Sequence, residues 1–140
     1  MKFNVFLLGL CLALPIALPS FAQDSRDTAF LTARDAFRAG DRNKLERSTA
    51  QLGNHELAPY AENYRLRMYM DQGDAIALRD FFERYDKSYV VEKLRADWIR
   101  WLGKRFVWNE VETEYARMIA PEPDVTCYNQ QARLARDDRS

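Results

Sequence analysis

Acidic side chains at short spacings are the first residues in this sequence that could do chemistry. Glu110, Glu112 and Glu114 alternate, and Asp80 precedes Glu83 by about one helical turn. A glycosidase acid needs a carboxyl group in an apolar cleft that raises its pKa. These five residues instead stand among Arg and Lys, which is typical of solvated helix faces. We therefore expect them on outer surfaces and assign no catalytic residue.

The one histidine and the cysteines do not extend this chemistry. His55 lies in a predicted loop, without a second His or a Cys at the spacing of metal ligands. A single histidine with no partnered Ser or Cys motif does not predict a nucleophile and base. The sequence also has no glycine-rich phosphate loop. We expect no metal and no cofactor, and no substrate-binding residue is assigned.

Aromatic side chains in the middle of the chain could offer a surface on which sugar rings stack. They are Tyr60, Tyr64, Tyr69, Trp98, Trp101 and Trp108. Most coincide with positions predicted to be buried, and a tryptophan stripe at helical spacing more often packs than binds. We therefore interpret these residues mainly as packing residues.

The first 22 residues have the pattern of a secretory signal peptide. Lys2 gives a positive start, an apolar run follows, and Ser20 and Ala22 occupy the small-residue positions before a cleavage site. The strictly apolar stretch 5–14 is too short to span a bilayer. We predict a signal peptide over residues 1–22, a mature chain that begins at Gln23 in an oxidising compartment, and no stable membrane span.

Charge is balanced along the mature chain. Removal of Lys2 leaves 20 of the 21 basic residues against 21 acidic ones, a net charge of −1. The charges are interspersed and form no basic block, so nucleic acid is not an expected partner.

Helical patterns dominate, and strand signals are nearly absent. The predicted helices span 25–39, 41–52, 59–71, 74–85, 88–103, 107–119 and 124–137. Two of these helices carry buried stripes at the spacing of one helix face. The stripes are Leu94, Trp98, Trp101 and Leu102 in the fifth helix, and Val107, Val111, Tyr115 and Met118 in the sixth.

Pairs of helices recur with a period of 33 residues. Gly40-Asp41 and Gly73-Asp74 each place a helix-ending Gly beside an Asp that can cap the next helix. Apolar residues align at the same offset. The columns are Ala33, Leu66 and Ile99; Ala36, Tyr69 and Leu102; Leu45, Leu78 and Val111; and Leu52, Tyr85 and Met118. The third unit departs at its turn, where Gly103 comes three residues early. This period predicts one all-α domain over 23–140, a superhelical solenoid of antiparallel helix pairs.

The segment from Leu94 to Ala135 resembles the soluble lytic murein transglycosylases, in the amino-terminal part of their U-shaped helical domain. Three elements carry the resemblance: W-x-x-x-L-G from Trp98 to Gly103, an aromatic residue seven positions before Tyr115, and the Cys127-Tyr128 pair. The resemblance implies a periplasmic protein that contacts peptidoglycan glycan strands. It further implies cleavage of the β-1,4 link between N-acetylmuramic acid and N-acetylglucosamine by the complete enzyme.

The family's catalytic glutamate is followed by serine in a separate lysozyme-like domain. None of the nine glutamates here is followed by Ser, so no catalytic residue carries over and we expect this chain alone to be inactive. The resemblance also implies that Cys127 pairs with a cysteine downstream of Ser140. We therefore expect the chain to be the front part of a longer protein.

The sequence thus predicts the helical scaffold of a secreted lytic transglycosylase. Two alternatives remain open at this point: a secreted adaptor of the tetratricopeptide type that binds a protein, and a periplasmic regulator of wall enzymes.

Overall fold

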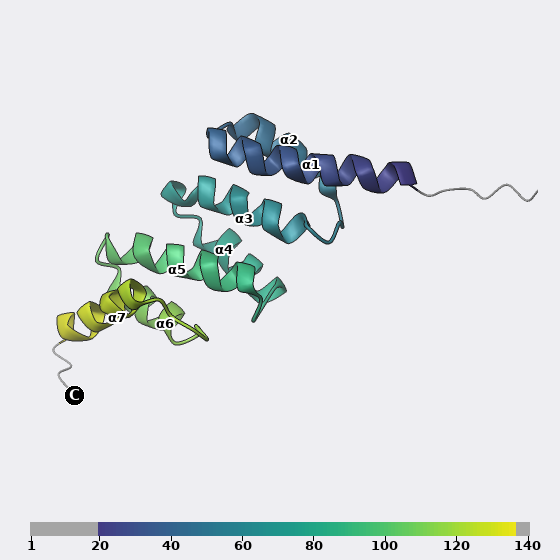
Figure 1. The fold of residues 1–140 in the computed structure, drawn as a ribbon. Helices are drawn as coiled ribbons and strands as arrows, with labels where there is room; N and C mark the ends of the chain where they lie inside the picture. Colours follow the sequence, from purple (N-terminus) through teal and green to yellow (C-terminus); the bar gives the residue numbers. More distant parts are fainter. Residues whose placement is uncertain (1–19, 137–140) are drawn as a thin grey trace, which may run out of the picture.

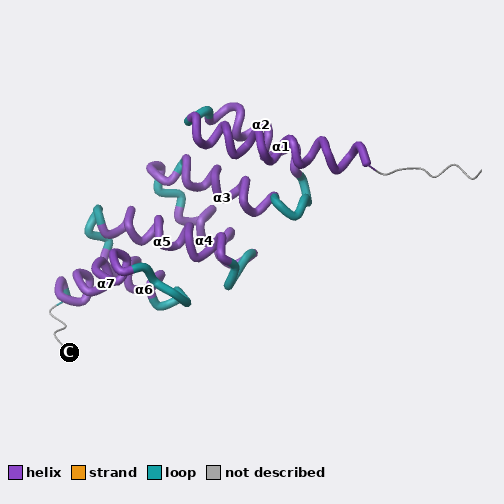
Figure 2. Tube along the Cα trace, viewed as in Figure 1, coloured by secondary structure: helices purple, strands orange, loops and turns teal. Residues whose placement is uncertain are grey.

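The computed structural model describes residues 20–136, with side chains from residue 25 onward, and all regular structure in this part of the chain is helical (Figures 1 and 2). The helices are α1 (Ser20–Ala39), α2 (Arg42–Leu52), α3 (Ala58–Met68), the short 3-10 helix η1 (Met70–Gln72), α4 (Ala75–Arg84), α5 (Tyr89–Gly103), α6 (Trp108–Tyr115) and α7 (Pro123–Ala135). The predicted all-α class is confirmed. Most of the predicted signal peptide, residues 1–19, lies outside the described residues.

The helices pack on their neighbours along an elongated array that runs from α1 and α2 to α6 and α7 (Figure 1). Helix α1 contacts α2 and α3, α3 contacts α5, and α5 contacts α6 and α7. The first helix of each predicted pair therefore contacts the first helix of the next pair, in the order α1, α3, α5 and α7. The superhelical solenoid of antiparallel helix pairs remains a prediction.

The predicted turn chemistry is present at the first two turns. Gly40 and Gly73 have φ angles of 70° and 67°, which L-residues with a side chain rarely adopt. The carboxylate of Asp41 accepts a hydrogen bond from the backbone N–H of Lys44 at 2.9 Å, and that of Asp74 accepts from Ala77 at 3.0 Å. Each Asp thereby satisfies an N–H in the first turn of the next helix.

At the third turn the left-handed position belongs to Phe106 rather than to Gly103. Phe106 has φ 60° and stands 33 residues after Gly73, so the period of the backbone continues although the glycine does not. The interpretation of Gly103 as the turn residue is wrong, because Gly103 is the last residue of α5. An ideal Cβ on Gly103 would lie 2.2 Å from Cδ1 of Tyr128 in α7, so the glycine provides room for that ring.

We expect Gly103→Ala to destabilise the chain by about 1–3 kcal/mol, because the added methyl group overpacks the contact between α5 and Tyr128. Urea denaturation measures this cost. In a Tyr128→Leu background the same substitution should cost less than half as much, since the ring is gone. An equal cost in both backgrounds would contradict the packing role.

Nine of the twelve residues in the 33-residue columns are buried, and the other three, Tyr69, Tyr85 and Met118, are half-buried. The buried residues include Ala33, Leu66, Ile99, Leu45 and Val111, and Ala132 in α7, which stands 33 residues after Ile99, is buried as well. Buried residues form two clusters. One joins α1, α2 and the start of α3, and the other extends from the end of α3 to α7.

Two predicted helices end earlier than expected. Helix α3 ends at Met68 and continues as η1, and α6 ends at Tyr115 instead of residue 119. The stripe predicted for the sixth helix is therefore incomplete: Val111 is buried, whereas Val107 precedes the helix and is exposed. Within residues 20–136, no helix combines the length and apolar character needed to cross a bilayer.

Candidate binding groove

A groove of about 520 Å³ lies between α3, α5 and the start of α7, which are the first helices of their predicted pairs. We call it the first-helix groove. Three tyrosines line it, Tyr60, Tyr64 and Tyr89. Five charged side chains also line it: Arg67, Lys93, Asp97, Arg100 and Glu122.

Helical spacing places these side chains on one face. On α3, Tyr60, Tyr64 and Arg67 stand at i, i+4 and i+7. On α5, Tyr89 begins a similar stripe that continues through Lys93, Asp97 and Arg100. The two helices are joined at the groove floor, because the buried amide of Asn63 donates a hydrogen bond to the carbonyl of Val90 at 3.2 Å.

The tyrosines differ in how much of each ring is free. Tyr64 stacks on Phe37 of α1, with ring centroids 5.0 Å apart. Tyr60 is 42% exposed and Tyr89 is 70% exposed, with the Lys93 ammonium 5.7 Å from the Tyr89 ring centroid. Tyr60 and Tyr89 therefore present ring surface that a ligand can stack on.

Ion pairs tie the groove helices together. Arg67 on α3 pairs with Asp97 on α5 at 2.7 Å, and Asp97 also pairs with Arg100 at 3.0 Å. Arg100 then reaches the start of α7, where it pairs with Glu122 at 2.5 Å and with Asp124 at 2.6 Å. One chain of ion pairs thus connects three successive first helices.

Lys93 completes this network by pairing with Glu122 at 2.6 Å. The hydrogen bond from Lys93, followed by that from Arg100, lowers the pKa of Glu122 below its ordinary value of 4.5. The hydrogen bond from Arg100 likewise lowers the pKa of Asp124 below 3.8. The bond to Glu122 raises the pKa of Lys93 above 10.5, and the bond to Asp124 raises that of Arg100 although burial opposes it.

These shifts predict an acid-sensitive contact between α5 and α7. A carboxylate with a lowered folded-state pKa contributes stability above its unfolded-state pKa and loses it as the pH falls through the folded value. Stabilisation by Glu122 and Asp124 should therefore be complete above their ordinary values of 4.5 and 3.8 and disappear at lower pH. Lys93 should lose its contribution only as the pH rises through a folded pKa above 10.5.

Thermal denaturation between about pH 6 and pH 3 tests this expectation. The difference in midpoint between the wild type and the double variant Glu122→Gln, Asp124→Asn should shrink as the pH falls. A difference that stays constant over this range would contradict the assigned ion pairs.

The paired charges determine what the groove can bind. Arg67, Lys93 and Arg100 are matched by Asp97, Glu122 and Asp124, so the groove carries fixed, mutually neutralised charges beside exposed tyrosine rings. Such a surface offers stacking and hydrogen bonds to an uncharged, hydroxyl-rich ligand without leaving a charge unpaired. No group of His, Cys, Asp and Glu within the described residues has the arrangement of a metal site.

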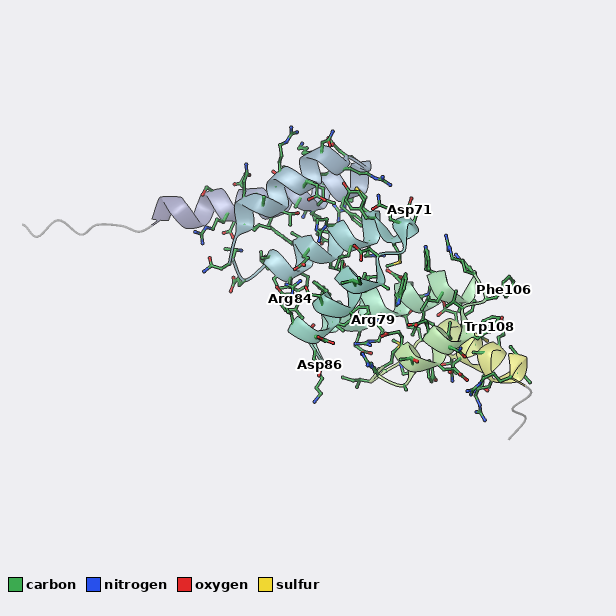
Figure 3. All side chains as sticks on the ribbon, turned by 180° about the vertical axis from the view of Figure 1, so that it is seen from behind. Asp71, Arg79, Arg84, Asp86, Phe106 and Trp108 are labelled. Carbon is green, nitrogen blue, oxygen red and sulfur yellow. The ribbon has the colours of Figure 1, made fainter. Side chains whose placement is uncertain are left out.

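The aromatic residues singled out in the sequence separate into two sets. Trp98 is 3% exposed and packs on Trp101 with ring centroids 4.7 Å apart, which confirms its packing role. Trp101 is half-buried beneath the guanidinium of Arg105, 3.8 Å from the ring centroid. Trp108 contacts Phe106 edge to face (Figure 3). Tyr69 lies under Arg42, away from the first-helix groove, and only Tyr60 and Tyr64 join the groove.

The prediction that all five acidic residues lie on solvated faces is wrong for Glu114. Its side chain is 1% exposed and pairs with Arg95, which is 3% exposed, at 2.5 Å. Glu114 follows the buried Val111 by three positions and so shares its face of α6. The other four remain at least partly exposed: Glu110 pairs with Arg79, Glu112 with Arg136, Asp80 with Arg84, and Glu83 has no ion pair among the described residues.

His55 and Cys127 take no part in the groove. His55 accepts a hydrogen bond at Nδ1 from the backbone N–H of Leu57 at 3.3 Å, and its Nε2 lies 3.4 Å from Asp27. Cys127 is an exposed, free cysteine on α7. Its pairing with a downstream cysteine stays a prediction.

Sequence reasoning missed two features of the groove that were visible in the period. Tyr89 begins a polar stripe on the fifth helix, opposite the apolar stripe that was recognised. Arginine also recurs at the 33-residue offset on all four first helices. The column consists of Arg34, Arg67, Arg100 and Arg133.

Comparisons with known proteins add no relative: no family model, no curated protein and no solved structure matches this chain.

Proposed function

We propose that this chain is a helical scaffold that holds peptidoglycan glycan strands for a secreted lytic transglycosylase. The proposal assigns glycan contact to the first-helix groove and assigns no catalytic residue to the chain. It places the mature protein in the periplasm. Its main support is the groove itself, where exposed tyrosine rings stand beside charges that are already paired.

The elements that carry the resemblance also meet in one packed region, which gives them a common physical role. Gly103, at the end of W-x-x-x-L-G, makes room for Tyr128 of the Cys-Tyr pair. The hydroxyl of Tyr115, from the second element, lies 3.2 Å from the hydroxyl of Thr126. These contacts hold α7 against α5 and α6. They thereby also position Glu122, which lines the groove at the start of α7.

Glycan chemistry fits this groove better than a charged peptide does. A pyranose ring stacks its C–H face on an aromatic ring and directs hydroxyls to polar neighbours. An acidic or basic peptide would instead have to compete with the existing ion pairs for each arginine and carboxylate. The neutral balance of the groove therefore favours sugar over charged peptide.

Cosedimentation with purified peptidoglycan tests the proposal. The chain should bind saturably, and the double variant Tyr60→Ala, Tyr89→Ala should weaken binding at least tenfold, because each lost stacking contact removes about 1 kcal/mol. Phe106→Ala, which removes an aromatic ring of similar exposure outside the groove, should leave binding unchanged.

Two results would reject the proposed ligand. One is an absence of binding by a folded wild type, and the other is binding that Phe106→Ala reduces as much as the tyrosine variant does. Groove-dependent capture of a defined protein, with no binding to peptidoglycan, would favour the adaptor alternative.

A further inference from the structure

One polar side chain at the floor of the first-helix groove is almost completely buried. Asn63 stands on α3, three positions after Tyr60 and four before Arg67, and so shares their face of the helix. Asn63 is 5% exposed and lines the groove. Helices α3 and α5 lie side by side (Figure 1), and Nδ2 of Asn63 donates to the carbonyl of Val90 on α5 at 3.2 Å. Asn63 is therefore held between two helices with one side toward the groove.

The hydrogen bond to Val90 determines which end of the Asn63 amide remains free. A backbone carbonyl can only accept, so the NH2 end of the amide must face it and Oδ1 takes the other branch. Among the described residues, no donor reaches this Oδ1. The enclosed side-chain polar atoms without a partner in this part of the chain belong to Thr49, Arg95 and Trp101, so Oδ1 of Asn63 is open to solvent. Because Asn63 lines the groove, this unused acceptor opens into it.

The charged groups around Asn63 are already matched. Arg67, Lys93 and Arg100 each donate to a carboxylate of the groove network. A cationic donor placed at Oδ1 would bring a charge that finds no free counter-charge there, and its desolvation would oppose binding. A neutral N–H or O–H donor gains the hydrogen bond without this cost. The free acceptor therefore favours a neutral donor.

Apolar surface beside Asn63 distinguishes between the two neutral donors. Val90 is 8% exposed, lines the groove and accepts the hydrogen bond from Asn63, and the exposed ring of Tyr89 precedes it in the chain. An acetamido group brings an N–H for Oδ1 together with a methyl group that can cover this surface. A hydroxyl group can donate the same hydrogen bond, but it leaves the apolar surface in water.

We propose that Asn63 selects N-acetylated sugars in the first-helix groove. Its Oδ1 accepts a hydrogen bond from the N–H of the 2-acetamido group of an N-acetylhexosamine, and the acetyl methyl group packs on Val90 and the neighbouring tyrosine rings. This inference rests on the proposed function, because it takes glycan binding by the groove as given. It adds the residue and the sugar substituent that determine the specificity of that binding.

Two tetrasaccharides that share the β-1,4 linkage and differ at C2 of each ring test the proposal. Chitotetraose carries an acetamido group at this carbon, and cellotetraose carries a hydroxyl group. Each is titrated into the full chain while backbone and side-chain amide resonances are followed. Chitotetraose should bind about tenfold more tightly, because it adds one hydrogen bond and one buried methyl group. It should also shift the side-chain amide resonance of Asn63 more than cellotetraose does.

Variants assign this preference to Asn63. Asn63→Ala removes the acceptor and should reduce the preference to less than about threefold. Ser48→Ala, which removes a buried hydroxyl of α2 outside the groove, should leave the preference unchanged. If Asn63→Ala does not fold, the preference of the wild type and the shift of the Asn63 side-chain amide decide the question alone.

The outcomes separate this inference from the proposed function. Equal binding of the two tetrasaccharides would overturn the role of Asn63 while glycan binding by the groove stands. A preference that Asn63→Ala retains, or that Ser48→Ala loses, would overturn it as well. Binding of neither tetrasaccharide at the groove would reject the proposed function and this inference together.

Discussion

Glu114→Ala should destabilise the chain by about 3–5 kcal/mol, the largest cost we expect from a single charged residue. Glu114 and Arg95 are almost completely buried and face each other at 2.5 Å. Removal of the carboxylate leaves the Arg95 guanidinium inside the protein with no opposite charge. The cost is the desolvation of an unpaired cation rather than the loss of one contact.

Urea denaturation measures this effect, and an exposed pair supplies the control. Arg79 pairs with Glu110 at 2.8 Å on the surface of the same region, so Arg79→Ala should cost less than about 1 kcal/mol. The double variant Arg95→Met, Glu114→Leu should recover most of the stability, because it leaves no buried charge. If Glu114→Ala cost no more than Arg79→Ala, the buried ion pair would be contradicted.

Trp98→Ala should cost a similar amount, about 3–5 kcal/mol, for a different physical reason. The ring is 3% exposed, stacks on Trp101 and belongs to the larger buried cluster from α3 to α7. Its removal loses apolar burial and leaves a cavity that neighbouring helices fill only partly.

Chemical denaturation again gives the measurement, with Ile76→Ala as the control. Ile76 is 81% exposed on α4, so its truncation should change stability by no more than about 0.5 kcal/mol. An unchanged midpoint for Trp98→Ala, together with weakened peptidoglycan binding, would instead mean that Trp98 acts as a sugar platform.

Local patterns were enough to predict the helices and most of the core. Apolar residues at a 33-residue offset mark positions that each helix must bury, so Ala33, Leu66 and Ile99 could be placed inside without coordinates. The capping roles of Asp41 and Asp74 could be predicted equally well, because a capping carboxylate acts within its own turn.

Features that depend on contact between helices could not be predicted in the same way. The burial of Glu114 requires a partner on α5, and nothing in the sequence of α6 names Arg95 as that partner. The role of Gly103 depends on a ring from α7, and the third left-handed turn is formed by Phe106, a residue that disfavours that conformation. For Glu114 and Gly103, the decisive contact comes from another helix and not from the local sequence.

The features of the groove could be predicted only in part. Tyr60, Tyr64 and Arg67 share one face by spacing alone, and the recurrence of arginine at Arg67 and Arg100 was visible in the sequence. The pairing of their charges was not, because it depends on α3, α5 and α7 lying side by side. That neutralisation is what favours an uncharged ligand.

Amide mapping with a soluble β-1,4-linked N-acetylglucosamine oligomer tests the central claim most directly. The account predicts saturable resonance shifts that concentrate on the groove faces of α3 and α5, around Tyr60, Tyr64 and Tyr89, and that disappear in the Tyr60→Ala, Tyr89→Ala variant. The absence of shifts at saturating oligomer, or shifts confined to α2, α4 or α6, would contradict it.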